Sequence, residues 1–273
     1  MAVTEQEAKD SAKYIQDRTI LLFEQNGDLF KPKGSGVTME FLDLYFIITA
    51  SHVIIDDKPL YFYLPGFGIQ KIEEIYREAI DYNLEGNYNQ DVGYIILSIK
   101  SALSISLTHT FKHPKSSLMI HDMVHDTIPY QLYQIAGYPE KFNRQIKLDE
   151  ELDHIYPATL TSAPIKNPNK VFKYYKLNPI SHYILQGKGV GDTMKEENRF
   201  QKAPPWNGMS GGGIWLMGFY EGEVLPILIG IFTEIRTGKY YSYIGCKINI
   251  ILKRIITIEQ AGVFGTSTNL SKP

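Results

Sequence analysis

Short apolar segments alternate with turn-forming residues along most of the chain. The segments are rich in Ile, Tyr, Phe and Val, which favour half-buried strands, and Asn26-Gly27 suits a tight turn. Predicted strands lie at residues 19–23, 36–41, 44–50, 59–64, 92–99, 130–138, 182–186, 212–217, 224–232 and 240–245. Many short strands at close spacing favour a sandwich or barrels over alternating strand–helix units. The pattern therefore predicts an all-β fold.

Helical periodicity is clearest in two stretches, Gln70–Ile80 and Ile248–Gln260, and we expect a helix in each. Residues 1–17 are polar and fit either a helix or a loose segment. The region 147–205 contains several Pro, Asn and Lys residues and predicts long loops.

A composition shift at Thr108–Thr127, rich in His, Lys and Ser, has the character of a surface connector. We use it to divide the chain into two halves. The expected organisation is a polar extension at 1–18, an N-terminal half at 19–115, a C-terminal half at 116–262 and a loose tail at 263–273.

Composition narrows the function classes. The 273 residues hold 28 Lys+Arg against 30 Asp+Glu, a formal net charge of −2, which argues against broad nucleic-acid binding. One cysteine, Cys246, excludes an intrachain disulfide and fits a reducing compartment. The N-terminus lacks the apolar stretch of a signal peptide, and no apolar run approaches the roughly 20 residues of a membrane helix. We therefore expect a soluble cytoplasmic protein that binds neither nucleic acid nor membrane.

Three short segments carry candidate chemistry. An apolar strand ends abruptly at His52, Asp91 stands just before another apolar strand, and Ser210 lies in the glycine-rich run Gly208-Met209-Ser210-Gly211-Gly212. Each alone has an ordinary structural interpretation, as a strand-end histidine, a turn or cap aspartate and a tight turn. Their order, with gaps of 39 and 119 residues, allows the three side chains to meet between two packed halves.

Serine is a weak nucleophile, so a neighbouring imidazole must take its proton during attack. A buried carboxylate fixes the imidazole tautomer and stabilises the imidazolium that forms. Glycines around the serine leave backbone N–H groups able to bind a developing oxyanion, and losing one such donor typically costs about 100- to 1,000-fold in turnover.

These segments resemble the His, Asp and Ser motifs of trypsin-like, chymotrypsin-fold serine peptidases. Gly34-Ser35-Gly36 is similar to the family's entry into the histidine strand, and Ala136-Gly137-Tyr138-Pro139 to an element of bacterial members. The run 227–233 is similar to the strand that follows the nucleophile loop. The resemblance covers about Thr19 to Ile256 and implies two packed six-stranded antiparallel β-barrels with a few short helices.

The resemblance also implies residue roles. His52 would be the general base and acid, Asp91 the orienting carboxylate and Ser210 the nucleophile that forms an acyl-enzyme. The N–H groups of Gly208 and Ser210 would form the oxyanion hole. The substrate pocket would involve Pro204, Pro205, Trp206, Thr233 and Glu234. The family needs no metal or organic cofactor.

The sequence departs from the digestive members of the family at two places. Met209 stands where those enzymes carry an aspartate that captures a new N-terminus on activation, and no cysteine adjoins His52. Both differences suit a bacterial intracellular member that is not activated by such a cleavage. The segment Ala203–Trp206 holds no carboxylate for Lys or Arg, which disfavours tryptic specificity, although Glu234 on the cleft strand complicates that inference.

Competing signals are weaker. His121 and His125 have the i, i+4 spacing of a helical zinc site, but Asp122 is a short acid and no third ligand is evident. Gly187–Asp192 lacks the spacing of a phosphate-binding loop and is interpreted as an ordinary loop. Cys246 fits a small core residue.

The sequence thus predicts a serine endopeptidase acting on protein or peptide substrates. Two alternatives stay open, a latent or non-catalytic protease-like module that binds a protein partner in its cleft, and a zinc hydrolase that uses His121 and His125. A protease in the cytoplasm requires restraint by narrow specificity, a latent loop or a regulatory protein partner, and residues 147–205 are the candidate segment for that control.

Overall fold

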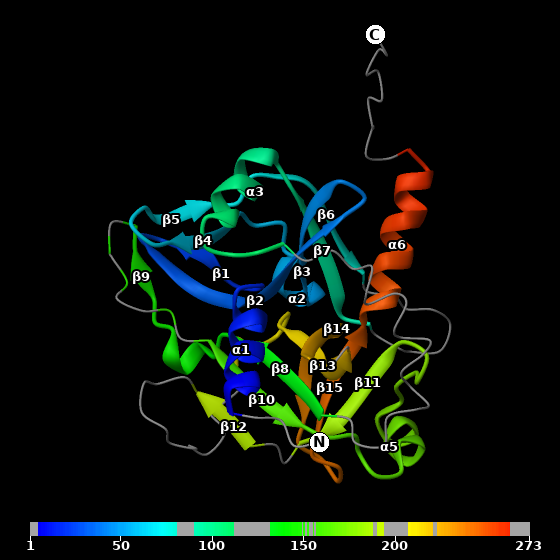
Figure 1. Ribbon diagram of the computed structural model, residues 1–273. Coiled ribbons are helices and arrows are strands. Elements are labelled where there is room, and N and C mark those ends of the chain that lie inside the picture. The colour runs from blue at the N-terminus through cyan, green and yellow to red at the C-terminus, as the bar shows by residue number, and fades with distance from the viewer. Residues whose placement is uncertain are drawn as a thin grey trace.

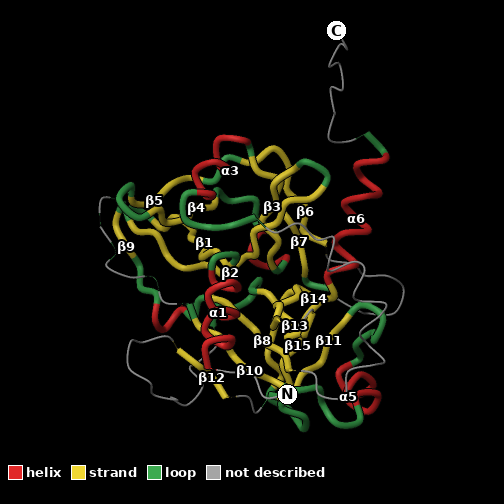
Figure 2. The backbone as a smooth tube through the Cα atoms, viewed as in Figure 1, coloured by secondary structure: helices red, strands yellow, loops and turns green. Residues whose placement is uncertain are grey.

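The computed structural model describes residues 5–80, 90–111, 132–148, 150, 152, 155, 157–187, 190–193, 207–220 and 223–262. Strands account for 47% and helices for 22% of the described residues. The strands form two antiparallel sheets, and one of them is a half-barrel (Figure 1 and Figure 2). The all-β expectation is confirmed at this level. The described strand pairings form sheets of eight and seven strands, and two closed six-stranded barrels are not among them.

The first sheet comes almost entirely from the N-terminal part of the chain. Its order is β5-β4-β1-β2-β3-β7-β6, with β9 paired to β2. Its strands are β1 (Thr19–Asn26), β2 (Leu29–Phe41), β3 (Leu44–Thr49), β4 (Leu60–Leu64), β5 (Gly68–Lys71), β6 (Glu74–Ile80), β7 (Val92–Leu97) and β9 (Ile146–Lys147).

The second sheet has the order β11-β15-β14-β13-β8-β10-β12. Its strands are β8 (Leu132–Gly137), β10 (Ala158–Ser162), β11 (His182–Gln186), β12 (Val190–Thr193), β13 (Gly213–Tyr220), β14 (Glu223–Arg236) and β15 (Ser242–Lys247). Short helices complete the described fold, namely α1 (Glu5–Gln16), α2 (Ser51–Ile54), α3 (Ile99–Ser106), the 3₁₀ turn η1 (Glu140–Phe142), α5 (Pro168–Tyr175) and α6 (Ile248–Gln260).

The helix expected at Gln70–Ile80 is wrong, because this segment forms β5 and β6. Residues Glu74–Ile80 pair with β7 across Val92–Leu97. That ladder of backbone hydrogen bonds and the burial of Ile80 outweigh a local helical preference, which is a weak determinant. The helix expected at Ile248–Gln260 is confirmed as α6, whose buried face carries Ile248, Ile251, Leu252, Ile255 and Ile258.

The strand expected at 182–186 is confirmed as β11, but the prediction of long loops over the rest of 147–205 is wrong in part, since this region also contains β10, α5 and β12. Most of the proposed connector, residues 112–127, and the tail at 263–273 lie outside the described residues. No described helix has the length and apolar character needed to cross a membrane.

The largest apolar core lies between the two sheets. It joins Val37 and Phe46 of the first sheet with Trp215 and Ile231 of the second, and α6 packs onto it. Separate apolar clusters fill the interior of each sheet. Cys246 is fully buried in the shared core, and burial raises the pKa of its thiol. The shared core holds together the two sheets whose strand ends and connections carry the candidate site.

Candidate active site

His52 lies on a short helix directly after β3. Helix α2 buries Ser51, Val53 and Ile54 and packs against β6 and β7, which leaves His52 on its outer face. Half of the His52 side chain, 50%, is exposed. A strand end followed by one tight helical turn therefore presents the imidazole to solvent from a rigid base.

Asp91 stands immediately before β7 and faces His52. Its carboxylate lies 2.7 Å (Oδ2) and 3.0 Å (Oδ1) from His52 Nδ1, and Oδ1 accepts the His52 main-chain N–H at 3.1 Å. The Ser51 hydroxyl donates to the same Oδ1 at 2.7 Å. The structure thus brings together two of the three residues predicted for the triad.

These contacts favour the ionised form of the Asp91 carboxyl. Burial acts to raise the pKa of the Asp91 carboxyl, but the hydrogen bonds and charge of His52 and the Ser51 hydroxyl outweigh it, and the pKa is lowered. An ionised carboxylate at Nδ1 requires the proton of a neutral imidazole to sit on Nδ1. Nε2 is then the nitrogen able to accept a proton from a reactant.

The loop at Gly208–Gly212 requires glycine at two positions. Gly208 and Gly211 have φ values of +89° and +90°, a region that favours glycine. A Cβ on Gly211 would lie 2.0 Å from the Ser35 carbonyl oxygen and 2.1 Å from Thr49 Oγ1. The glycine-rich run is therefore required for close packing against β2 and the end of β3.

The same packing brings Ser210 close to the histidine helix. A Cβ on Gly34 would lie 2.6 Å from Val53 Cγ2 and 3.1 Å from the Ser210 carbonyl oxygen, so these two residues flank one glycine. Gly211, next to Ser210, lies against Thr49 and Ala50, just ahead of His52. All three predicted triad residues therefore occupy one region of the molecule.

The Ser210 hydroxyl donates to the Thr233 carbonyl oxygen at 2.9 Å. Within the described part of the chain no hydrogen bond joins Ser210 to His52. In the structure the Ser210 hydroxyl is therefore engaged by β14 and not by the imidazole.

The predicted oxyanion-hole donors are the N–H groups of Gly208 and Ser210, and each is oriented by a hydrogen bond to the carbonyl of its own peptide. The Asn207 carbonyl accepts Glu140 N–H at 2.6 Å, and the Met209 carbonyl accepts Gly212 N–H at 2.9 Å. In a planar trans peptide the N–H points opposite to the C=O, so the N–H groups of Gly208 and Ser210 point away from these contacts. Among the described residues neither N–H donates a hydrogen bond.

The predicted substrate pocket is described only in part. Pro204, Pro205 and Trp206 lie outside the described residues. Thr233 is buried, and its hydroxyl donates to the Ile244 carbonyl at 3.3 Å. The Glu234 carboxylate forms an ion pair with Arg236, with Oε1 2.6 Å from Nη2, so its charge is partly neutralised. Asp91, Thr233 and Glu234 line one cavity of about 140 Å³.

The candidate zinc residues His121, Asp122 and His125 lie outside the described part of the chain. The loop predicted at Gly187–Asp192 is wrong in part, because residues 190–192 belong to β12, and residues 188 and 189 lie outside the described part. In the described part, no group of three or more His, Cys, Asp or Glu side chains could hold a metal ion. No protein-family model matches the sequence, and no curated protein matches it either. The geometry of the site therefore carries the functional argument.

Sequence reasoning missed the polar residues that support the candidate triad. Ser51 contacts Asp91, and Ser35 contacts the glycine-rich loop that holds Ser210 through its hydroxyl and its main chain. Both lie in segments that the sequence singles out, beside His52 and between Gly34 and Gly36. Their hydrogen bonds join residues far apart in the chain, and no local pattern predicts such pairs.

Proposed function

We propose that the protein is a serine endopeptidase that uses Ser210 as nucleophile, His52 as general base and acid, and Asp91 as orienting carboxylate. The observation that carries the proposal is the Asp91–His52 pair, with Oδ2 2.7 Å from Nδ1, beside a glycine-rich loop that leaves two N–H groups without partners among the described residues. The combination supplies a base, its orienter and donors for an oxyanion, the parts that acyl transfer needs.

The proposed reaction begins when the Ser210 hydroxyl turns from the Thr233 carbonyl towards His52 Nε2. Nε2 takes the proton as Oγ attacks the peptide carbonyl, and Gly208 and Ser210 N–H groups bind the oxyanion. His52 then protonates the leaving amine, which leaves an acyl-enzyme on Ser210. Water, deprotonated by the same nitrogen, releases the acid product. Asp91 stays ionised and stabilises the imidazolium.

The same proposal extends to the barrel architecture of the fold. We place each sheet as one of two packed barrels of a chymotrypsin-like fold, with the site between them. Support comes from the assembly of the site, because Ser35, His52 and Asp91 come from the first sheet and its connections, whereas Ser210 and Thr233 come from the second. In this proposal the substrate is a protein or peptide, and residues 147–205 are the candidate region for control.

Ser210→Ala is expected to lower peptide hydrolysis by about a million-fold without loss of folding. The measurement is cleavage of a mixed peptide library by wild type and variant, followed by mass spectrometry. Ser162→Ala, which removes another buried serine hydroxyl, is the matched control and should keep wild-type activity. Full activity in Ser210→Ala would contradict the proposal, and loss of activity with a metal chelator would favour the zinc alternative.

One observation favours a second candidate, a latent or non-catalytic module that binds a protein partner. The Ser210 hydroxyl is engaged by Thr233 rather than His52. A folded wild type that cleaves no peptide would support this alternative.

A further inference from the structure

We propose that Ser35 is a positioning residue that holds the nucleophile loop in a conformation ready to bind an oxyanion. This inference rests on the proposed function and deepens it, since a loop held in this way requires no activating cleavage. Ser35 is fully buried, with 0% exposure, and its side chain lies where the two sheets approach each other.

The hydroxyl of Ser35 links two main-chain segments. It accepts the Tyr138 N–H at 2.8 Å and donates to the Gly208 carbonyl at 2.9 Å. The Ser35 main-chain N–H donates to the Ser210 carbonyl at 2.8 Å. One residue thus holds the carbonyls on both sides of Met209, through its side chain on one side and its backbone on the other.

Four consecutive carbonyls of the loop are held by hydrogen bonds. Asn207 and Met209 accept from Glu140 N–H and Gly212 N–H, and Gly208 and Ser210 accept from Ser35. Because each peptide is planar, fixing its carbonyl also fixes the direction of its N–H. The bonds from Glu140 and Gly212 thereby set the directions of the Gly208 and Ser210 N–H groups, and Ser35 holds the peptide that follows each of them. Ser35 thus acts on the two donors through the adjoining peptides, without an added charge, and the neighbouring Met209 side chain is fully buried.

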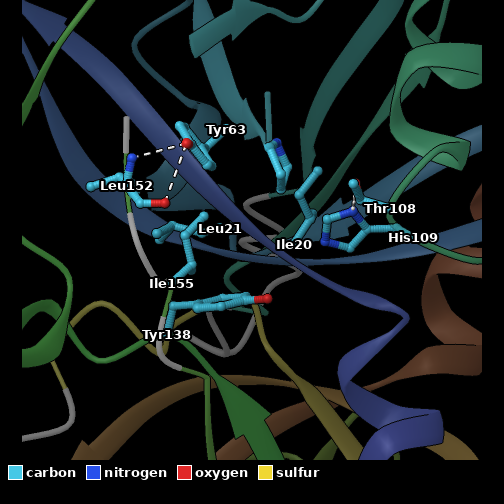
Figure 3. A pocket seen from close by; sticks show the side chains of 9 residues that line it. Ile20, Leu21, Tyr63, Thr108, His109, Tyr138, Leu152 and Ile155 are labelled. Carbon is cyan, nitrogen blue, oxygen red and sulfur yellow. Dashed lines mark hydrogen bonds between the residues drawn. The ribbon is translucent and has the colours of Figure 1, made fainter. Parts of the chain in front are cut away.

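Tyr138, the donor to Ser35, is anchored independently. Its hydroxyl donates to the Thr19 carbonyl at 2.9 Å, and its ring lines a cavity of about 280 Å³ on the side of the first sheet (Figure 3). The Tyr138 N–H is thus held by a side chain packed away from the nucleophile loop. The Ser35 hydroxyl thus connects this anchored N–H to the Gly208 carbonyl.

Removal of the Ser35 hydroxyl would leave a space too small for a water molecule to take its place. A Cβ on neighbouring Gly137 would lie 2.9 Å from Ser35 Oγ and 3.0 Å from the Met209 carbonyl oxygen, so the surroundings are tightly packed. The space of one hydroxyl is smaller than a water molecule needs. In Ser35→Ala the Gly208 carbonyl and the Tyr138 N–H would lose their shared partner, and the loop would shift to find others.

The test compares Ser35→Ala with wild type and with Ser162→Ala. For peptide hydrolysis we expect kcat to fall about 10- to 100-fold in Ser35→Ala, below the cost of deleting an oxyanion donor outright. KM should stay within about 3-fold, because ground-state binding does not use the oxyanion hole. A general loss of folding would lower the amount of active enzyme, so active sites are titrated before kcat is calculated. Ser35→Cys, which fills the space with a weaker donor and acceptor, should change kcat in the same direction.

Amide hydrogen exchange supplies a readout that does not depend on activity. Peptides covering 207–213 contain the Gly211 and Gly212 N–H groups, which donate to Phe232 and Met209. Their exchange should accelerate in Ser35→Ala and not in Ser162→Ala. An active wild type with unchanged kcat in Ser35→Ala would overturn the inference. If the wild type is inactive, the proposed function fails, and unchanged exchange would then overturn the role of Ser35 separately.

Discussion

Asp91 adopts a backbone conformation that few residue types tolerate. Its φ is +42°, in the region where glycine, Asn and Asp are most often found. The carboxylate is held there by Ser51 and by two nitrogens of His52. At the scale of single residues, we therefore expect the backbone at position 91 to tolerate asparagine, which has the shape of aspartate without its charge, far better than a side chain of a different shape.

Asp91→Asn is expected to keep the backbone conformation and to lower peptide hydrolysis by about 10,000-fold, because the amide favours the wrong imidazole tautomer. The measurement is kcat/KM on the peptides that wild type cleaves. Near-normal kinetics in this variant would exclude Asp91 as the orienting residue.

The lowered pKa of Asp91 also predicts how stability depends on pH. The unfolded chain binds the proton of this carboxyl more readily than the folded protein does, so stability from Asp91 rises with pH in the acid range. The contribution is complete above the ordinary carboxyl pKa of about 3.9 and is lost as pH falls through the folded value. Urea unfolding of wild type and Asp91→Asn should therefore differ most above about pH 4 and converge below it. A constant difference would contradict the assignment of the lowered pKa.

At the scale of elements, alternation and β-branched content predict the strands, and amphipathic spacing predicts α6. The segment 70–80 has helix-like spacing but forms strands, because its partner β7 supplies a ladder that the local sequence does not contain. Helix α3 follows β7 directly, starting after Ser98, whose hydroxyl accepts Ser101 N–H at 3.2 Å. A capping hydroxyl inside an apolar run is a weak local signal, and the predicted strand at 92–99 extended into this helix.

The polar N-terminal segment, left undecided by its composition, forms α1. Ile15 is fully buried in the shared core, and the Tyr14 ring meets Trp215 edge-on with centroids 6.3 Å apart. Helix α1 contacts β1 of the first sheet and β8 and β14 of the second. It therefore contributes to holding the two sheets together.

Ile15→Ala should lower the free energy of unfolding by about 2–5 kcal/mol, the usual cost of emptying a packed core position. Lys13→Ala, two residues away on a side chain that is 76% exposed, should change it by less than about 0.5 kcal/mol. Urea unfolding of both variants makes the comparison. Equal stabilities would show that α1 is dispensable for the core.

At the scale of the whole molecule, the candidate site exists only where the sheets meet. The order of the three motifs in the chain predicts that His52, Asp91 and Ser210 meet. In the structure the packing of the two sheets on a shared core places these residues in one region. The supporting hydrogen bonds of Ser35, Ser51 and Thr233 could not be predicted, since each depends on the packing of segments distant in sequence. The orientation of the Ser210 hydroxyl likewise depends on the carbonyl geometry of β14.

An activated serine is the central claim, and labelling with a fluorophosphonate probe tests it most directly. Wild type, Ser210→Ala and Ser162→Ala are incubated with the probe, and intact mass is measured on protein shown to be folded. We expect one adduct on wild type and on Ser162→Ala and none on Ser210→Ala, because only a serine paired with a base reacts at a useful rate. Folded wild type without an adduct, or equal labelling of Ser210→Ala, would contradict the account.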